Sequence, residues 1–268
     1  MPGTATSIRN QLNGRLSRLE EAHPEWASLA GLVRLAVSGV APGWGDAALV
    51  EVGVQPGRGA TESGTPALEG AELQVDRSAI ETALREWPEL GGVPADRLTE
   101  ALCEAVSEAA PGNGPASVAA RYATIPLLEA AVIRTGIRVP SPASGWCPGC
   151  GAWPALAEVR GLEQHRMLRC GRCGGEWEYE LLRCSFCGER DHRKLATLGS
   201  DALPRFRLDG CSTCQGYLKS ATTLLPLSLG EILVTDLETV ALDLAAEEAG
   251  YRRPPGLGFP LQVRLRLV

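Results

Sequence analysis

Eight of the nine cysteines in this chain fall into four Cys-x-x-Cys pairs, here called knuckles, between residues 147 and 214. The knuckles are Cys147 and Cys150, Cys170 and Cys173, Cys184 and Cys187, and Cys211 and Cys214. Four thiolates in tetrahedral geometry are the ligand set that Zn²⁺ and rubredoxin-type iron take in proteins. The sequence therefore predicts two metal ions per chain, iron or zinc, with these eight cysteines as the ligands.

The gaps between the knuckles favour one pairing. Nineteen residues separate Cys150 from Cys170, and twenty-three separate Cys187 from Cys211, which suits the hairpin between two knuckles of a ribbon. Only ten residues separate Cys173 from Cys184. We expect the first knuckle to pair with the second and the third with the fourth. Interleaved pairing, first with third and second with fourth, is the main alternative.

Three knuckles carry a glycine directly after the second cysteine, where a positive φ is usually required and glycine reaches it without a Cβ clash. These are Gly151, Gly174 and Gly188, whereas the fourth knuckle has Gln215 there, followed by Gly216. Four copies of this pattern argue against thioredoxin-type redox catalysis, which would need one Cys-x-x-Cys opening a helix after a buried strand.

Disulfides are the other use of an even number of cysteines, and they would require an oxidising compartment. Residues 1–4 open no charged n-region, no apolar h-region follows, and no run approaches the ~18 apolar residues of a membrane span. We therefore expect a cytoplasmic protein without membrane insertion, in which the thiols stay reduced and bind metal.

Charge is distributed unevenly along the chain. Residues 1–146 hold 11 basic and 17 acidic side chains, which accounts for the whole net charge of −6, and residues 147–214 hold 10 basic and 9 acidic ones. Each divalent ion with four thiolates adds about −2 to the cysteine region. Nucleic-acid affinity depends on a local surplus of Lys and Arg, so no nucleic-acid partner is expected.

Periodicity predicts an α+β fold in which a helical N-terminal domain, residues 1–143, precedes two tandem four-cysteine rubredoxin-like modules. The modules are expected at 144–182 and 183–268, the second including a C-terminal helix capped by Asp236 and ended by Gly250. Pro140 to Gly145 marks the boundary, and residues 42–70 are expected to form a loop. Helices are expected near 8–19, 24–37, 80–87, 96–109, 115–124 and 126–135, and strands near 155–159, 167–168, 176–182, 194–198 and 217–225. Pro126 either begins the last of these helices or kinks a continuous one.

Residues able to carry catalysis are scarce. Eight sulfurs complete two tetrahedra, which leaves no open metal position for substrate or activated water. His165 and His192 lie among the knuckles but are not needed as ligands, and Cys103 is expected to be a small core residue of a helix. With neither a nucleotide-binding loop nor a Ser, His, Asp set, we expect no enzyme and no catalytic residue.

The residues around the knuckles resemble the formate dehydrogenase accessory protein FdhE family. The similar segments cover about residues 144 to 253 and end in an acidic helix followed by Tyr251, Arg252 and Arg253. They are Trp146 to Gly151, Leu168 to Cys170, Cys173, Glu176 and Trp177, Arg183 to Gly188, Cys211 to Lys219 and Leu242 to Arg253.

This resemblance implies a cytoplasmic maturation chaperone for the respiratory, molybdenum-dependent formate dehydrogenase, with the catalytic subunit of that enzyme as its partner. It also implies that the eight cysteines are the metal ligands, and that iron is the metal. The metals would be structural or redox-sensing. A rubredoxin-like electron-transfer protein is the alternative, because iron held by four thiolates can cycle between Fe(III) and Fe(II). A nucleic-acid-binding ribbon protein is a third, less favoured class.

Overall fold

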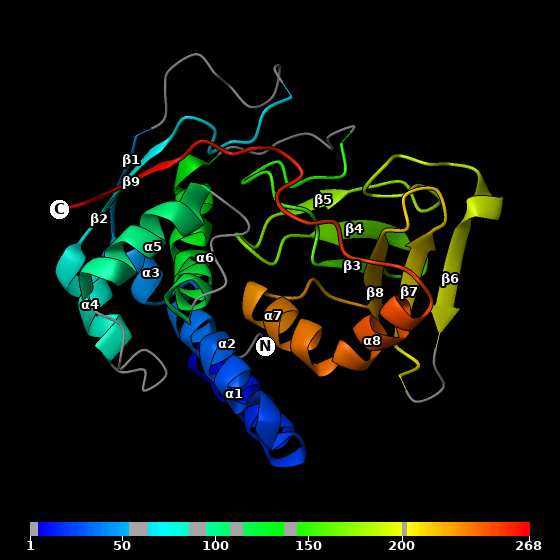
Figure 1. Ribbon diagram of the computed structural model, residues 1–268, viewed down its shortest axis with the longest axis horizontal. Helices are drawn as coiled ribbons and strands as arrows, with labels where there is room; N and C mark the ends of the chain where they lie inside the picture. The colour runs from blue at the N-terminus through cyan, green and yellow to red at the C-terminus, as the bar shows by residue number, and fades with distance from the viewer. Residues whose placement is uncertain (1–4, 54–63, 86–94, 108–114, 137–143, 200–202) are drawn as a thin grey trace.

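A computed structural model describes the chain except for residues 1–4, 54–63, 86–94, 108–114, 137–143 and 200–202. Its helical part lies on one side of the molecule and a larger sheet on the other, and the C-terminal segment runs from the sheet back to the helical part (Figure 1). The predicted α+β class, with a helical N-terminal region followed by the four-cysteine modules, is confirmed.

The helical part consists of α1 (Ala5–Ala22), the 3₁₀ turn η1 (Pro24–Trp26), α2 (Ala27–Gly39), α3 (Trp44–Ala48), α4 (Arg77–Arg85), α5 (Ala95–Ser107) and α6 (Pro115–Thr135). Except for α3, these correspond to the expected helices, and α6 is one continuous helix with Pro126 inside it, which is the second of the two alternatives for that proline. Gly39 and Gly45 approach Pro126 so closely that an added Cβ on either would lie 2.5 or 2.3 Å from its ring. Helices α2 and α3 therefore pack directly on the proline of α6.

A small sheet in this part was not expected from the sequence. Its strands are β1 (Leu49–Gly53), β2 (Glu72–Val75) and the C-terminal β9 (Arg264–Leu267), in the order β1-β2-β9. Strand β2 pairs antiparallel with β1 and parallel with β9. The prediction of a loop over residues 42–70 is therefore wrong at α3 and β1, and its middle lies outside the described residues.

The two cysteine modules share one sheet of six strands, in the order β5-β4-β3-β8-β7-β6. The strands are β3 (Leu156–Arg160), β4 (His165–Arg169), β5 (Glu176–Glu178), β6 (Leu195–Gly199), β7 (Phe206–Cys211) and β8 (Tyr217–Thr223), with the 3₁₀ turn η3 (His192–Lys194) before β6. The modules join where β3 pairs in parallel with β8. Strand β5 is shorter than expected, and β7 was not anticipated.

Two helices follow the sheet, α7 (Leu229–Glu238) and α8 (Val240–Glu248). Ser228 begins α7 with a capping box, because its hydroxyl accepts from the Glu231 N–H while Glu231 accepts from the Ser228 N–H. The prediction that Asp236 caps the C-terminal helix is therefore wrong, since Asp236 lies inside α7. Gly250 follows α8 with a φ of +85°, as the predicted helix end requires.

Buried side chains from both sides of the predicted 143/144 boundary form one cluster. Leu127 and Leu128 of α6 belong to it, together with Leu168, Leu218 and Val263. The boundary itself lies largely outside the described residues, and the three-domain division stays a prediction. None of the described helices combines the length and apolar character needed to cross a membrane.

Replacing Gly145 with alanine should destabilise the contact between the two modules. An ideal Cβ on Gly145 would lie 1.6 Å from the carbonyl oxygen of Ser185, which belongs to the third knuckle and cannot rotate away. We expect a loss of about 2–3 kcal/mol in the free energy of unfolding, measured by chemical denaturation. Gly199→Ala is the control, because no atom of the described residues lies within 4 Å of its added Cβ. Equal stability of the two variants would contradict this packing.

Candidate metal centres

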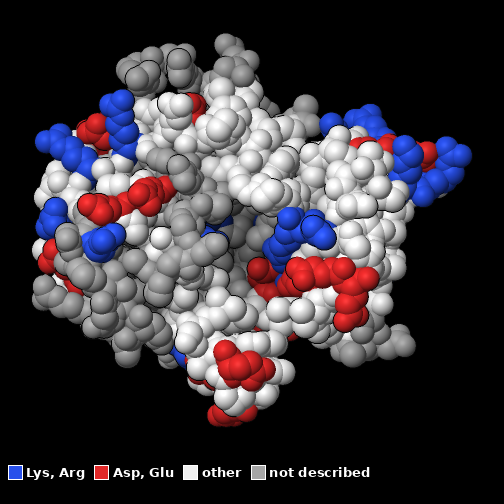
Figure 2. Space-filling model, viewed as in Figure 1, with Lys and Arg blue, Asp and Glu red and all other residues white. Residues whose placement is uncertain are grey.

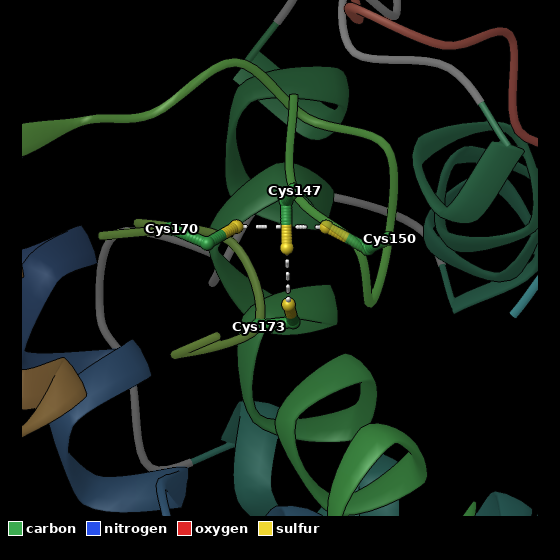
Figure 3. A group of neighbouring side chains, drawn as sticks. All are labelled: Cys147, Cys150, Cys170 and Cys173. Atoms are coloured by element: carbon green, nitrogen blue, oxygen red, sulfur yellow. Dashed lines mark hydrogen bonds between the residues drawn. The ribbon is translucent and has the colours of Figure 1, made fainter. Parts of the chain in front are cut away.

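The first and second knuckles bring four sulfurs together at the junction of α6 and the sheet. Figure 3 shows the side chains of Cys147, Cys150, Cys170 and Cys173 pointing at one another. The Sγ atoms of Cys147 and Cys173 lie 3.5 Å apart, as do those of Cys150 and Cys170. A tetrahedron with metal–sulfur bonds near 2.3 Å has an edge of about 3.8 Å, whereas a disulfide bond is only about 2.05 Å long. We call this cluster the inner site.

The third and fourth knuckles form an equivalent cluster, the outer site. The Sγ atoms of Cys184 and Cys214 lie 3.7 Å apart, and those of Cys187 and Cys211 also 3.7 Å. In each site the four sulfurs lie within 4.8 Å of one another. The knuckles therefore pair first with second and third with fourth, as the gaps indicated, and do not interleave. Both sets of four sulfurs fit a tetrahedral ion such as Zn²⁺ or iron. Metal binding at the two sites stays a prediction.

All four knuckles repeat one backbone pattern. In each, the N–H of the first cysteine donates to the carbonyl five residues later, as from Cys147 to Ala152 at 2.8 Å and from Cys211 to Gly216 at 2.9 Å. Backbone N–H groups also point at sulfur, for example from Arg172 to the Sγ of Cys170 at 3.3 Å. Such N–H groups stabilise the negative charge of thiolates, so the loops are built for deprotonated sulfur.

The residue after the second cysteine has a positive φ in every knuckle. The angle is +73° at Gly151, +72° at Gly174, +77° at Gly188 and +56° at Gln215, which confirms the conformation inferred from the three glycines. Gln215 is one of only two non-glycine residues with a positive φ in the described part of the chain. The backbone of Gln215 therefore adopts a left-handed conformation that costs about 1 kcal/mol or more.

Gln215→Gly should raise the stability of the outer module. We expect the free energy of unfolding to rise by about 0.5–1 kcal/mol, because glycine adopts the left-handed conformation without strain. The greater flexibility of glycine in the unfolded chain offsets part of this gain. The reciprocal variant Gly188→Ala should lose about 1 kcal/mol, because it introduces the same strain without close backbone contacts. Chemical denaturation measures both. A gain in the alanine variant would contradict this explanation.

The inner site is enclosed by segments from distant parts of the chain. Its four cysteines are at most 2% exposed. The N–H groups of Ala67 and Leu68 donate to the carbonyls of the first knuckle at 2.8 and 3.0 Å, and the N–H of Phe259 donates to Gly151 at 2.9 Å. Arg172 donates to the carbonyl of Ala105 at the end of α5 at 2.6 Å. The inner site therefore fastens the N-terminal part, the sheet and the C-terminal segment to one another.

Burial raises the pKa of the Cys147 thiol well above its usual range in the metal-free protein. A buried thiolate without a counter-cation is costly, because desolvation penalises its charge. A bound cation reverses this balance, so metal binding would release protons from the site. This chemistry supports the fit of the inner site to a divalent ion.

The outer site is accessible from solvent. Cys187 and Cys214 are exposed, whereas Cys184 and Cys211 are buried. Glu189 bridges the third and fourth knuckles, since its Oε2 accepts from the Thr213 hydroxyl at 2.7 Å. Backbone N–H groups, above all that of Asp191, together with Thr213 and Lys194, lower the pKa of Glu189 to about 2. The carboxylate therefore stays charged and keeps the two knuckles joined over the ordinary pH range.

The remaining sequence candidates lie apart from both sulfur clusters. The ring of His165 contacts Glu163 at 2.8 Å, and His192 is in η3, so neither joins the ligand groups found in the described residues. Cys103 is half-buried in α5, where its thiol lies 3.7 Å from the carbonyl oxygen of Leu265 in β9. These positions agree with the prediction that none of the three is needed as a ligand.

A buried ionic cluster beside the sheet was not anticipated as a unit, although the resemblance quoted three of its members. The Nζ of Lys219 is fully buried and lies 2.7 Å from carboxylate oxygens of Asp236 and Asp243. Arg253 contacts the same two carboxylates at 2.6 and 2.9 Å. Burial acts to raise the pKa of Asp236, but Arg253 and Lys219 hold it below its usual range. The sequence features that could have indicated this cluster are a lysine within a predicted strand and two aspartates seven positions apart.

Comparison with known proteins points to one family. A region of 112 residues is 31% identical to the FdhE homologue of Aquifex aeolicus and covers 40% of this chain and 38% of that protein. A region of 109 residues is 30% identical to the FdhE homologue of Shewanella baltica, and one of 110 residues is 28% identical to FdhE of Escherichia coli. Each of these two regions covers 35% of the relative. The matches thus span little more than a third of the length of these relatives, and no family model matches the chain.

A solved structure resembles the chain over almost its whole length. The crystal structure of the FdhE protein from Pseudomonas aeruginosa superposes with a TM-score of 0.67 and 24% identity, covering 97% of this chain and 98% of that one. This likeness shows the fold over nearly the whole chain, whereas the sequence matches cover about 40% of it. Together, the sequence and structure comparisons confirm the resemblance to the FdhE family.

Proposed function

We propose that this relative of the FdhE proteins is a cytoplasmic accessory protein that assists maturation of the respiratory, molybdenum-dependent formate dehydrogenase by binding its catalytic subunit. The observation that carries the proposal is the order and geometry of the four knuckles, in a chain similar in sequence and fold to FdhE proteins. The name of those relatives supports the role in formate dehydrogenase maturation. The partner subunit and the compartment belong to the proposal.

The proposed role of the metals is structural or redox-sensing. A four-cysteine site holds a tetrahedral ion without an open coordination position, so neither site offers a place for substrate. We propose all eight cysteines as ligands and iron or zinc as the ion, because thiolates accept both. On this basis the chain is not an enzyme, and it acts through the surfaces that its metals stabilise.

A deletion experiment tests this function. Cells that lack the protein should lose respiratory formate oxidation while the dehydrogenase polypeptide is still made, because an assembly factor acts after synthesis. Activity should return on expression of the chain. Full formate-dependent respiration in the deletion strain, grown anaerobically with sufficient molybdate, would contradict the proposal.

Electron transfer is the second candidate, and the exposure of the outer site favours it. Cys187 and Cys214 are open to solvent, so an iron ion there would lie close to a docked redox partner. Reversible reduction of bound iron, together with electron exchange with a formate dehydrogenase subunit, would support this candidate. Zinc in both sites of the native protein would exclude it, since Zn²⁺ has no accessible second oxidation state.

A further inference from the structure

A cavity of about 330 Å³ opens where the helical part, the sheet and the C-terminal segment meet. Its wall includes residues of α6, the segment after the first knuckle, the second and third knuckles, α7 and the chain after α8. Figure 2 shows a hollow near the centre of this face, with basic side chains at its edge. Cavities of this size are large enough to hold a small molecule.

Positive charge predominates in the wall of this cavity. Among the residues that the structure describes, Arg121, Arg172 and Arg253 line it, against a single carboxylate, that of Asp236. The chain as a whole carries a net charge of −6, so a cationic cavity is not a consequence of overall composition. A surplus of guanidinium groups in a concave site attracts anions, because the low-dielectric walls concentrate their field.

Asp236 is already neutralised by its neighbours. The Nζ of Lys219 lies 2.7 Å from its Oδ1, and Nη2 of Arg253 lies 2.6 Å from the same atom. Arg253 is also held by Asp243 at 2.9 Å. The carboxylate therefore does not cancel the charge of Arg121, which faces the cavity from α6. Arg172, in the second knuckle, lies beside the sulfurs of the inner site, whose thiolates offset part of its charge.

Arg121 and Arg172 have hydrogen-bonding capacity that the described part of the chain leaves unused. The Nε of Arg121 and the Nη1 of Arg172 are buried and have no hydrogen-bond partner among the described residues. The Nη2 of Arg172 donates to the carbonyls of Ala105 and Val106 at 2.6 and 2.8 Å, which fixes its guanidinium at the wall. Buried donors without acceptors are costly, so a ligand that supplies oxygen atoms here would be favoured.

Aromatic side chains complete the wall. Trp153 and Phe186 meet edge to face, with ring centroids 5.4 Å apart, and Tyr122 lines the cavity from α6. Flat apolar surfaces beside guanidinium groups suit a ligand with an aromatic or other flat body and an anionic end.

We propose that this cavity binds a small ligand that carries an oxyanion, either phosphate or carboxylate, on a flat apolar body. Arg121 would donate a hydrogen bond to the oxyanion, and Arg172 would donate a second one. Trp153 and Phe186 would contact the flat apolar body of the ligand. The inference is independent of the proposed function. Binding is tested on the purified chain alone, so its failure would leave the maturation role untouched.

Isothermal titration calorimetry on the metal-loaded full chain provides the test. The probes are phenyl phosphate and phenylacetate, with inorganic phosphate and benzyl alcohol as partial ligands. At least one aromatic anion should bind at least about ten-fold more tightly than either partial ligand, because it alone uses both the guanidinium donors and the flat surface. The tighter of the two aromatic probes identifies phosphate or carboxylate as the preferred group.

Variants of α6 identify the site. Arg121→Gln should weaken the tighter probe by at least about ten-fold, and Arg121→Lys should retain part of the affinity. Arg134→Gln is the matched control, since Arg134 lies on the same helix outside the cavity, and its exposed pair with Asp46 contributes little. The thermal midpoint of Arg121→Gln should be unchanged or higher, because no hydrogen bond within the described structure is lost.

Three results would overturn the proposal. One is equal affinity for inorganic phosphate and the aromatic anions, which would indicate attraction of any anion. A second is equal weakening by Arg121→Gln and Arg134→Gln. The third is a lower thermal midpoint in Arg121→Gln with unchanged binding, which would assign Arg121 a purely structural role.

Discussion

Replacing Cys147 and Cys150 with alanine will remove one metal ion per chain and prevent the protein from forming its stable native core. Both cysteines are fully buried, and the inner site joins three distant segments of the chain. Structural zinc sites contribute about 10–16 kcal/mol in small peptides, which equals or exceeds the ~5–15 kcal/mol net stability of a typical domain. Elemental analysis of the soluble fraction and thermal unfolding followed by circular dichroism measure the effect.

The matched variant replaces Cys187 and Cys214, the exposed pair of the outer site, with alanine. It should also lose one ion, but it should keep the other and a cooperative thermal transition of the helical part. The contrast follows from burial, since Cys187 and Cys214 are exposed whereas all four cysteines of the inner site are buried. Equal loss of stability in the two double variants would contradict the assignment of the inner site to the main core.

Lys219→Met will destabilise the protein by about 3 kcal/mol or more. The side chain of Lys219 is fully buried between Asp236 and Asp243, so its removal leaves two carboxylates that share only Arg253. Removing one partner of a buried charge pair typically costs 3–5 kcal/mol. The lower end of this range applies here, because the Asp236 and Asp243 side chains are 36% and 20% exposed and thus only partly desolvated. The measurement is the free energy of unfolding from denaturant titration at neutral pH.

The other lysine of the chain provides the control. Lys194 pairs with Glu189 at 3.2 Å and is about half exposed. Surface pairs of this kind contribute up to about 1 kcal/mol, so Lys194→Met should cost far less than Lys219→Met. If the two methionine variants unfold at the same denaturant concentration, the ionic cluster around Lys219 does not hold the C-terminal helices to the sheet.

The sulfur clusters could be predicted from the sequence because knuckle geometry is local. Two intervening residues and a positive φ after the second cysteine determine where both sulfurs point, and even Gln215 adopts this conformation. The pairing followed from gap lengths, because each hairpin, β3 with β4 and β6 with β7, fits between its two knuckles. Helices α1, α2 and α5 were predictable for a similar reason, since their apolar spacing is a property of one segment.

Features that depend on distant partners could not be predicted. Strand β9 has the sequence Arg-Leu-Arg-Leu, and only its parallel pairing with β2, almost 190 residues earlier in the chain, makes it a strand. The parallel contact of β3 with β8 likewise joins two modules that the sequence presents as independent. Asp favours the helix-cap position, but α7 already begins at the Ser228 capping box, and Asp236 inside it pairs with Lys219 and Arg253.

The two sites differ in burial, and the difference suggests separate roles within the proposed function. The inner site holds the molecule together, whereas the outer site presents two thiolates to solvent. A redox-sensing metal needs access to its oxidant or reductant, so sensing would belong to the outer site. A structural metal needs protection from exchange, which the inner site provides.

The most direct test of the account is a pull-down of the natively expressed protein from anaerobic cells, with metal analysis of the same sample. The account predicts that the catalytic subunit of formate dehydrogenase is recovered with the chain and that close to two ions of iron or zinc are bound per chain. It also predicts that the purified chain alone does not oxidise formate. Recovery of two metal ions without any formate dehydrogenase subunit, or formate turnover by the chain itself, would contradict the central claim.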